Sequence, residues 1–231
     1  AYFTAANKEY LTIAENADLS FNGGGNFTFG CWVKLATAGA AYTLLGKLTE
    51  TGDQREVWIS TSGGLIYCQI STAGITGVGV SVTEPATNVW ALVIGKFTAG
   101  SEIRIRLKAV GASVWTESAA APAGTIFNST SNFSIGATGD GASYHLNGAI
   151  DSAFVTKRLT TEAEDDWLYN SGNGRTSEDV LNAADPVAAG LNDANLKALW
   201  DLKEADGANR AASKGSNTLT PAGASLTTVG E

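Results

Sequence analysis

The chain has 231 residues and a formal net charge of −8, from 15 Lys and Arg against 23 Asp and Glu. This acidic balance argues against a nucleic-acid partner, because a phosphate backbone favours clusters of Lys and Arg. No apolar run approaches the roughly 20 residues of a membrane-spanning helix, so we expect no membrane insertion.

The two cysteines, Cys31 and Cys68, are too few for a disulfide framework. Each lies in an alternating apolar run, which favours a buried, reduced thiol over a bridge. No secretory signal peptide is visible at the start of the sequence, and there is no Met. These features favour a chain made in the cytoplasm and not exported, with a mature or excised fragment as the alternative.

Alternation of apolar and polar residues dominates the first 155 residues and predicts β-strands. The clearest examples are 27–35, with Phe, Phe, Cys, Val and Leu on one face, and 102–108, with Ile, Ile and Leu on one face. Further strands are predicted at 9–13, 42–48, 55–60, 65–70, 78–82, 90–97, 114–117, 132–136 and 147–156. Turns rich in Gly, Ser, Thr and Asn separate them, and no helical crossovers intervene. The pattern predicts an all-β fold, an antiparallel two-sheet jelly-roll sandwich.

The pattern changes at Thr160. Thr161 and Glu164 have the spacing of a capping box, which predicts a helix that ends at Gly172. Residues 176–181 indicate a second, shorter helix, so one or two short helices are expected near 161–182. A linker at Pro186, an apolar segment over 196–202 and a polar tail follow. The acidic residues of this half lie largely at helix starts and turns.

Segments in a fixed order carry a family resemblance. Residues 2–13 supply an opening strand pair, and 19–34 supply a second strand with the sequence NFTFGCWVK. Residues 90–105 supply central strands, and 147–164 a closing strand followed by a helix. Together they resemble the laminin-G-like, concanavalin A-like lectin/glucanase jelly rolls over roughly residues 2–170. The closest likeness in style is to members associated with bacteriophage virions.

The C-terminal part adds a narrower resemblance. Residues 199–220 look like a segment that precedes the first strand in bacteriophage and environmental relatives, whereas here it comes last. The order therefore resembles a circular permutation, in which 196–231 returns beside the N-terminal strand and completes the sheet. On this interpretation 1–231 is a single laminin-G-like domain, and we expect deletion of 196–231 to unfold it.

No arrangement of residues predicts catalysis. His145 is the only histidine, and no nucleophile-elbow sequence is present. Retaining glycosidases need two carboxyl groups about 5–5.5 Å apart, and no predicted strand carries such a pair on one face. The acids of 162–166 lie at a predicted helix start, where capping accounts for them. We therefore expect that the protein is not an enzyme.

A structural calcium ion is implied by the resemblance. Members of this family place an aspartate of the closing strand against an early loop, and Asp151 matches that position. Asn22 and Asn26 would supply oxygens from the facing loop, in keeping with the hard oxygen ligands that Ca²⁺ prefers. The alternative is that Asp151 only accepts backbone hydrogen bonds at a strand junction.

Glycan binding in this fold implies aromatic side chains at loops or on an exposed face. Trp58, Trp115 and Tyr144 are candidate glycan-binding residues, because they lie near predicted strand ends or turns. Most of the other aromatic residues are expected in the core.

Two functions stay open at this point. The first is a non-enzymatic structural protein of a bacteriophage virion surface, a capsid decoration or fibre component made in the host cytoplasm. Its partners would be other virion or capsid proteins in an oligomeric assembly, and it would adhere to host or environmental glycans. The alternative is a calcium-dependent, lectin-like carbohydrate-binding module of an extracellular bacterial protein.

Overall fold

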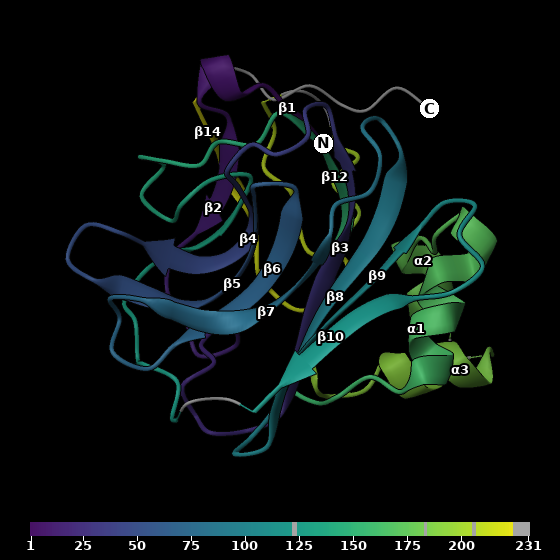
Figure 1. Ribbon diagram of the computed structural model, residues 1–231. Coiled ribbons are helices and arrows are strands. Elements are labelled where there is room, and N and C mark those ends of the chain that lie inside the picture. Colours follow the sequence, from purple (N-terminus) through teal and green to yellow (C-terminus); the bar gives the residue numbers. More distant parts are fainter. Residues whose placement is uncertain (122–123, 183, 205–206, 224–231) are drawn as a thin grey trace.

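Two antiparallel seven-stranded sheets form the molecule (Figure 1). This computed structural model describes residues 1–121, 124–182, 184–204 and 207–223. The sheets pack face to face, which confirms the predicted all-β jelly-roll sandwich. Among the described residues, none of the helices has the length and apolar character needed to cross a membrane.

Sheet A has the strand order β1-β12-β3-β8-β9-β10, and β13 also pairs with β12. Its strands are β1 (Tyr2–Phe3), β3 (Phe27–Leu35), β8 (Trp90–Thr98), β9 (Glu102–Ala109), β10 (Thr116–Ala120), β12 (Gly148–Thr156) and β13 (Leu196–Trp200). The strand predicted at 114–117 begins two residues later than expected. It follows a turn that ends before Trp115, and the Trp115 side chain packs against a helix.

Sheet B has the strand order β14-β2-β11-β4-β5-β6-β7. Its strands are β2 (Tyr10–Ile13), β4 (Tyr42–Thr49), β5 (Gln54–Ser62), β6 (Leu65–Ser71), β7 (Gly77–Thr83), β11 (Phe133–Ile135) and β14 (Thr220–Ala222). A short 3-10 helix, η1 (Ala5–Asn7), separates β1 from β2 and lets the chain pass from one sheet to the other.

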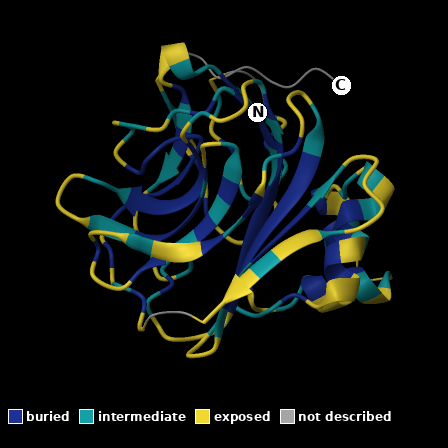
Figure 2. Cartoon of the chain, in the orientation of Figure 1, coloured by how far each residue is buried: buried dark blue, intermediate teal, exposed yellow. Residues whose placement is uncertain are grey.

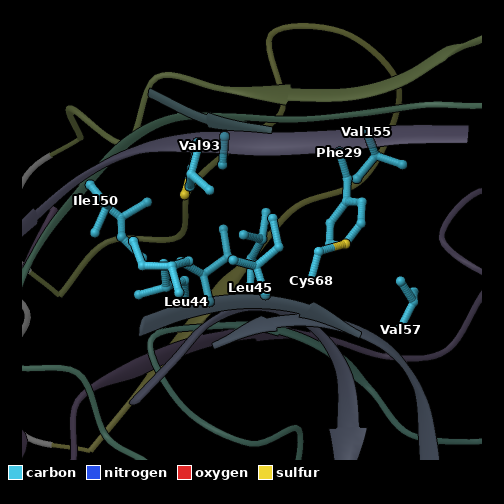
Figure 3. Packing of buried hydrophobic residues seen from close by; sticks show 14 of the residues in the cluster. Phe29, Leu44, Leu45, Val57, Cys68, Val93, Ile150 and Val155 are labelled. Carbon is cyan, nitrogen blue, oxygen red and sulfur yellow. The ribbon is translucent and has the colours of Figure 1, made fainter. Parts of the chain in front are cut away.

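The core lies between the two sheets. Because side chains alternate across a strand, one face of each strand turns its apolar residues inward. Figure 3 shows Phe29, Val93, Ile150 and Val155 of sheet A facing Leu44, Leu45, Val57 and Cys68 of sheet B. Both cysteines are buried and unbridged, as predicted, and burial raises the pKa of each thiol.

Three short helices cover the outer face of sheet A (Figure 1). They are α1 (Glu162–Tyr169), α2 (Ser177–Leu181) and α3 (Pro186–Leu191), with a 3-10 turn, η2 (Asn170–Gly172), after α1. The capping box of α1 is confirmed: Thr161 Oγ1 accepts a hydrogen bond from the Glu164 amide, and Glu164 accepts one from the Thr161 amide. The first helix therefore begins where the sequence predicts.

The predicted linker at Pro186 is wrong, because α3 begins at this residue. Asp185 caps α3 by accepting hydrogen bonds from the amides of Val187 and Ala188 at 2.8 and 3.1 Å. Proline fits the first position of a helix, since its missing N–H would have no helical partner there. Leu191 of α3 packs in the apolar cluster between the helices and sheet A.

A buried carboxylate holds α1 on sheet A. Asp165 has no exposed surface and accepts hydrogen bonds from Thr160 Oγ1 at 2.6 Å and from Arg106 of β9. Its other contact is with Lys96 of β8, whose Nζ lies 2.7 Å from Asp165 Oδ2. Two cations from neighbouring strands therefore face one acid of the helix.

The C-terminal strands divide between the two sheets. β13 pairs with β12 in sheet A, and β14 pairs with β2 in sheet B. The fully buried Trp200 of β13 donates its indole N–H to the Asn217 carbonyl at 2.7 Å, which ties β13 to the segment before β14. Residues 205–206 and 224–231 of the predicted completing segment lie outside the described residues.

Candidate functional site

A pocket of about 360 Å³ lies on the outer face of sheet B, and we call it the sheet B pocket. Val57 and Ile59 of β5 face the core, so the alternation turns Trp58 and Ser60 outward. Tyr67 and Gln69 of β6 face outward for the same reason. The described lining comprises Ala41, Tyr42, Thr43, Leu48, Glu50, Arg55, Trp58, Ser60, Thr61, Ser62, Tyr67, Gln69 and Tyr144.

Trp58 forms part of the wall of the sheet B pocket. Its side chain is only 5% exposed, and no described residue accepts a hydrogen bond from its indole N–H. Gly77 of β7 makes room for the ring, since a Cβ there would lie 2.5 Å from the Trp58 ring carbons. The absence of a side chain on β7, two strands away from β5, therefore leaves the space that this indole occupies.

Tyr144 closes the sheet B pocket from the loop before β12. It is 39% exposed, and its carbonyl accepts a hydrogen bond from the Thr43 amide at 2.8 Å. Its hydroxyl donates to Glu50 Oε1 at 3.0 Å, and Arg55 Nη2 donates to the same oxygen at 3.1 Å. Burial, and then the hydrogen bond to Glu50, raise the pKa of Tyr144, so the phenol stays protonated near neutral pH.

Polar groups complete the floor of the sheet B pocket. Ser60 Oγ donates to Gln69 Oε1 at 3.4 Å. Thr43 is fully buried, and its Oγ1 finds no hydrogen-bond partner in the described structure. A buried hydroxyl without a partner costs free energy unless another molecule supplies one. The pocket thus combines aromatic rings with hydroxyl, amide and paired charged groups.

The structure brings together two of the three predicted glycan-binding residues. Trp58 and Tyr144, distant in sequence, line the sheet B pocket, whereas Trp115 lies on the outer face of sheet A. Trp115 Nε1 donates to Asp166 Oδ1 at 2.7 Å, and the Arg106 guanidinium lies 4.6 Å from the ring centre. The Trp115 ring therefore packs against α1 and against β9 of sheet A.

The predicted calcium ligands do not meet. Asp151 pairs in register with Trp32, whereas Asn26 precedes Phe27 at the start of β3. Six positions along the chain separate Asn26 from Trp32, or about 20 Å at the usual rise. Asn22 shares a hollow with Asn26, and Asp151 lines a different one. A calcium ion bound by all three residues therefore does not fit this geometry.

Asp151 instead accepts a backbone hydrogen bond, the alternative role that the sequence left open. Its Oδ1 accepts from the Ser152 amide at 2.7 Å. Within the described ranges, His, Cys, Asp and Glu side chains form no group of three placed to hold a metal. Calcium binding by this chain stays a prediction.

Sequence reasoning missed Thr43, Glu50, Arg55, Tyr67 and Gln69. Alternation in β6 contained a usable signal, because Tyr67 and Gln69 lie opposite the apolar residues of that strand. The pairing of Glu50 with Arg55 depends on how the β4–β5 turn folds, which the sequence pattern does not specify.

The two sheets and this aromatic, polar pocket define a lectin-like jelly-roll sandwich. Residues 5–164 match the Laminin_G_3 family, described as the concanavalin A-like lectin/glucanases superfamily, and the chain belongs to that family. Among curated protein sequences, none matches this chain.

Solved structures with a similar fold are distant in sequence. A Bacteroides ovatus ATCC 8483 protein proposed to bind carbohydrate has a TM-score of 0.63 at 15% identity, over 99% of this chain and 59% of its own. The tailspike protein 2 enzymatically active domain of bacteriophage CBA120 has a TM-score of 0.52 at 12% identity, over 74% of this chain and 26% of its own. Botulinum neurotoxin type C, described as interacting with two ganglioside molecules, has a TM-score of 0.50 at 11% identity, over 70% of this chain and 39% of its own. The chain therefore spans less than two thirds of each of these proteins.

Proposed function

We propose that this chain is a carbohydrate-binding module and that the sheet B pocket holds the sugar. The observation that carries the proposal is the joint placement of Trp58, Tyr67 and Tyr144 around unpaired polar groups. Aromatic rings offer apolar faces to sugar C–H groups, and a few placed polar groups fix the orientation of a small ligand. The unpartnered Trp58 N–H would bond to a sugar hydroxyl.

The pocket favours a neutral saccharide. Its two described charged residues, Glu50 and Arg55, form a salt bridge, so the lining carries no net charge. We propose that the module binds without cleaving. Glycoside hydrolysis usually uses two carboxylates, and Glu50 is the one carboxylate in the described lining.

A glycan array tests this function, with Tyr144→Ala as the decisive variant and Val114→Ala as the control. Val114 is 70% exposed and lies outside the pocket, so its loss changes apolar surface without touching the site. We expect wild type and Val114→Ala to bind the same neutral glycans, and Tyr144→Ala to bind at least tenfold more weakly. An array silent with and without calcium, or unchanged binding by Tyr144→Ala, would refute the proposal.

For the biological setting, we propose the surface of a bacteriophage virion, where the module would adhere to glycans as part of an oligomeric assembly. The resemblance of 199–220 to bacteriophage modules and the fold shared with a tailspike domain support this. An extracellular bacterial protein is supported to the same degree by the fold shared with the Bacteroides ovatus protein. Native mass measurement and co-purification with particles separate the two settings.

A further inference from the structure

A second pocket, of about 600 Å³, lies on the opposite side of the sandwich, and we call it the helix-side pocket. It opens between the outer face of sheet A and the segment 172–176 that joins η2 to α2. Its lining includes Trp32, Lys34, Trp90, Asp151, Arg175 and Lys203. The proposed function assigns nothing to these residues.

The helix-side pocket has a positive lining in an acidic protein. Lys34, Arg175 and Lys203 form no salt bridge with any carboxylate of the described ranges, whereas buried bases such as Lys47 and Lys96 are paired. Asp151 is the one acid in the described lining. Three cations facing one carboxylate create a local positive charge that a negatively charged ligand would neutralise.

Two of these cations are held by aromatic rings. Lys34 Nζ lies 5.1 Å from the centre of the Trp90 ring, and the Arg175 guanidinium lies 4.5 Å from that of Trp167. Arg175 Nε donates to the Trp167 carbonyl at 3.1 Å. The terminal guanidinium nitrogens have no partner among described residues, so they are available for a bidentate bond to an anion.

Trp32 supplies a donor to the helix-side pocket. It is 6% exposed, stacked on Tyr169 with ring centres 5.7 Å apart, and its indole N–H bonds to no described acceptor. A Cβ on Gly174 would lie 3.0 Å from this nitrogen, so the glycine lets the loop pass close to the indole edge. The half-buried Trp90 adds an apolar face.

Backbone strain holds Asp151, the one acid in the described lining of the helix-side pocket, in place. Ser152 has φ of +47° at an irregularity of β12, and its amide bonds to the Asp151 carboxylate. A non-glycine residue in this conformation is uncommon, and such strain clusters at binding sites. The arrangement holds an acceptor opposite the cations.

We propose that the helix-side pocket is a second saccharide site, specific for sugars that carry a carboxylate. The carboxylate bonds to Arg175 and Lys34, the sugar ring lies on Trp90, and Asp151 and the Trp32 N–H bond to hydroxyls. Ligand binding at this site does not depend on the sheet B pocket, so either proposed site can be refuted without refuting the other.

Titration with tri-galacturonate tests the site, and its fully methyl-esterified form is the matched neutral ligand. We expect binding of the acid, at least tenfold weaker binding of the ester, and further weakening between 50 and 500 mM salt. Arg175→Ala and Lys34→Gln should each weaken binding at least tenfold. Lys214→Ala, another half-buried base without a described salt bridge, should bind as wild type.

Two further variants make the test specific. Asp151→Asn should tighten binding, because it removes a negative charge and keeps a hydrogen-bonding group. Tyr144→Ala should leave it unchanged, and loss of acid binding here would instead place the acidic sugar in the sheet B pocket and overturn this inference. Arg175→Lys serves if Arg175→Ala does not fold. Equal binding of acid and ester, or silence towards every acidic glycan of an array, would also overturn it.

Discussion

The outer faces of the two sheets differ in what covers them. On sheet A, Trp32, Leu92 and Phe154 pack beneath α1, α2 and α3, and the helices turn their buried residues towards the sheet (Figure 2). On sheet B, Trp58 and Tyr67 face a pocket that no described helix covers. One face carries a second apolar cluster, and the other carries an open pocket.

One sandwich thus presents two different pockets. Each contains a nearly buried tryptophan, Trp32 or Trp58, whose indole N–H bonds to no described acceptor. Their electrostatics differ, because the charges of the sheet B pocket pair with each other, whereas the cations of the helix-side pocket have no described salt bridge. Of these cations, Lys34 lies on β3 itself, whereas Arg175 lies in the loop that precedes α2.

The largest expected effect is on the covered face. Asp165→Asn removes the charge that pairs with Lys96 and Arg106, and of these two cations Arg106 keeps its ion pair with Glu117. Breaking a buried ion pair typically costs about 3–5 kcal/mol, so we expect a loss of that order in urea unfolding. Glu162→Ala on the same helix is exposed and should change stability by less than about 0.5 kcal/mol. Equal effects would mean that this carboxylate does not anchor α1.

A smaller effect is expected on the open face. Gly77→Ala places a Cβ against the Trp58 ring and the Gln69 amide, so the indole must shift. Overpacking of this kind costs about 1–3 kcal/mol, and we also expect weaker binding of neutral glycans. Gly23→Ala is the control, because nothing lies within 4 Å of its added Cβ. Unaltered binding by Gly77→Ala would show that the position of Trp58 is not critical.

The smallest expected effect is a change in thermal stability at low pH. Burial of Glu164 raises its pKa, but hydrogen bonds from Arg158 and Thr161 outweigh this and hold the pKa below its usual value. A carboxyl group with a lowered folded-state pKa contributes stability that is present above the unfolded pKa and lost as pH falls through the folded one. Wild type should therefore exceed Glu164→Gln in Tm by about 2–4 °C at pH 6 and lose that advantage progressively as the pH falls below 4.5, the ordinary pKa of the group. A difference independent of pH would contradict this.

Much of the fold could be predicted, because alternation and capping are local signals. The strands around Phe29 and Ile105 and the start of α1 at Glu162 follow directly from them. Helix α3 was missed because Pro186 was interpreted as a linker, although Asp185 before it is a helix-start signal.

The candidate site was less accessible to sequence reasoning. Trp58 and Tyr144 meet only because β4 lies between β5 and β11, and the loop before β12 returns over them. Asp151 was placed in the correct strand, but the β12–β3 register sets it opposite Trp32, far from Asn26. Such distances depend on pairing between segments far apart in the chain, which local patterns do not encode.

The pairing of β14 with β2 has a consequence for how the protein is made. Thr220 lies opposite Thr12, so the edge of sheet B is completed by residues about 200 positions apart. Contacts of such long separation form slowly, and an unpaired strand edge is a template for another chain. While the ribosome is still adding residues, β2 must wait for β11 and β14, the two partners that are made later. The pace of synthesis, rather than the strength of any one contact, sets how long those edges stay open.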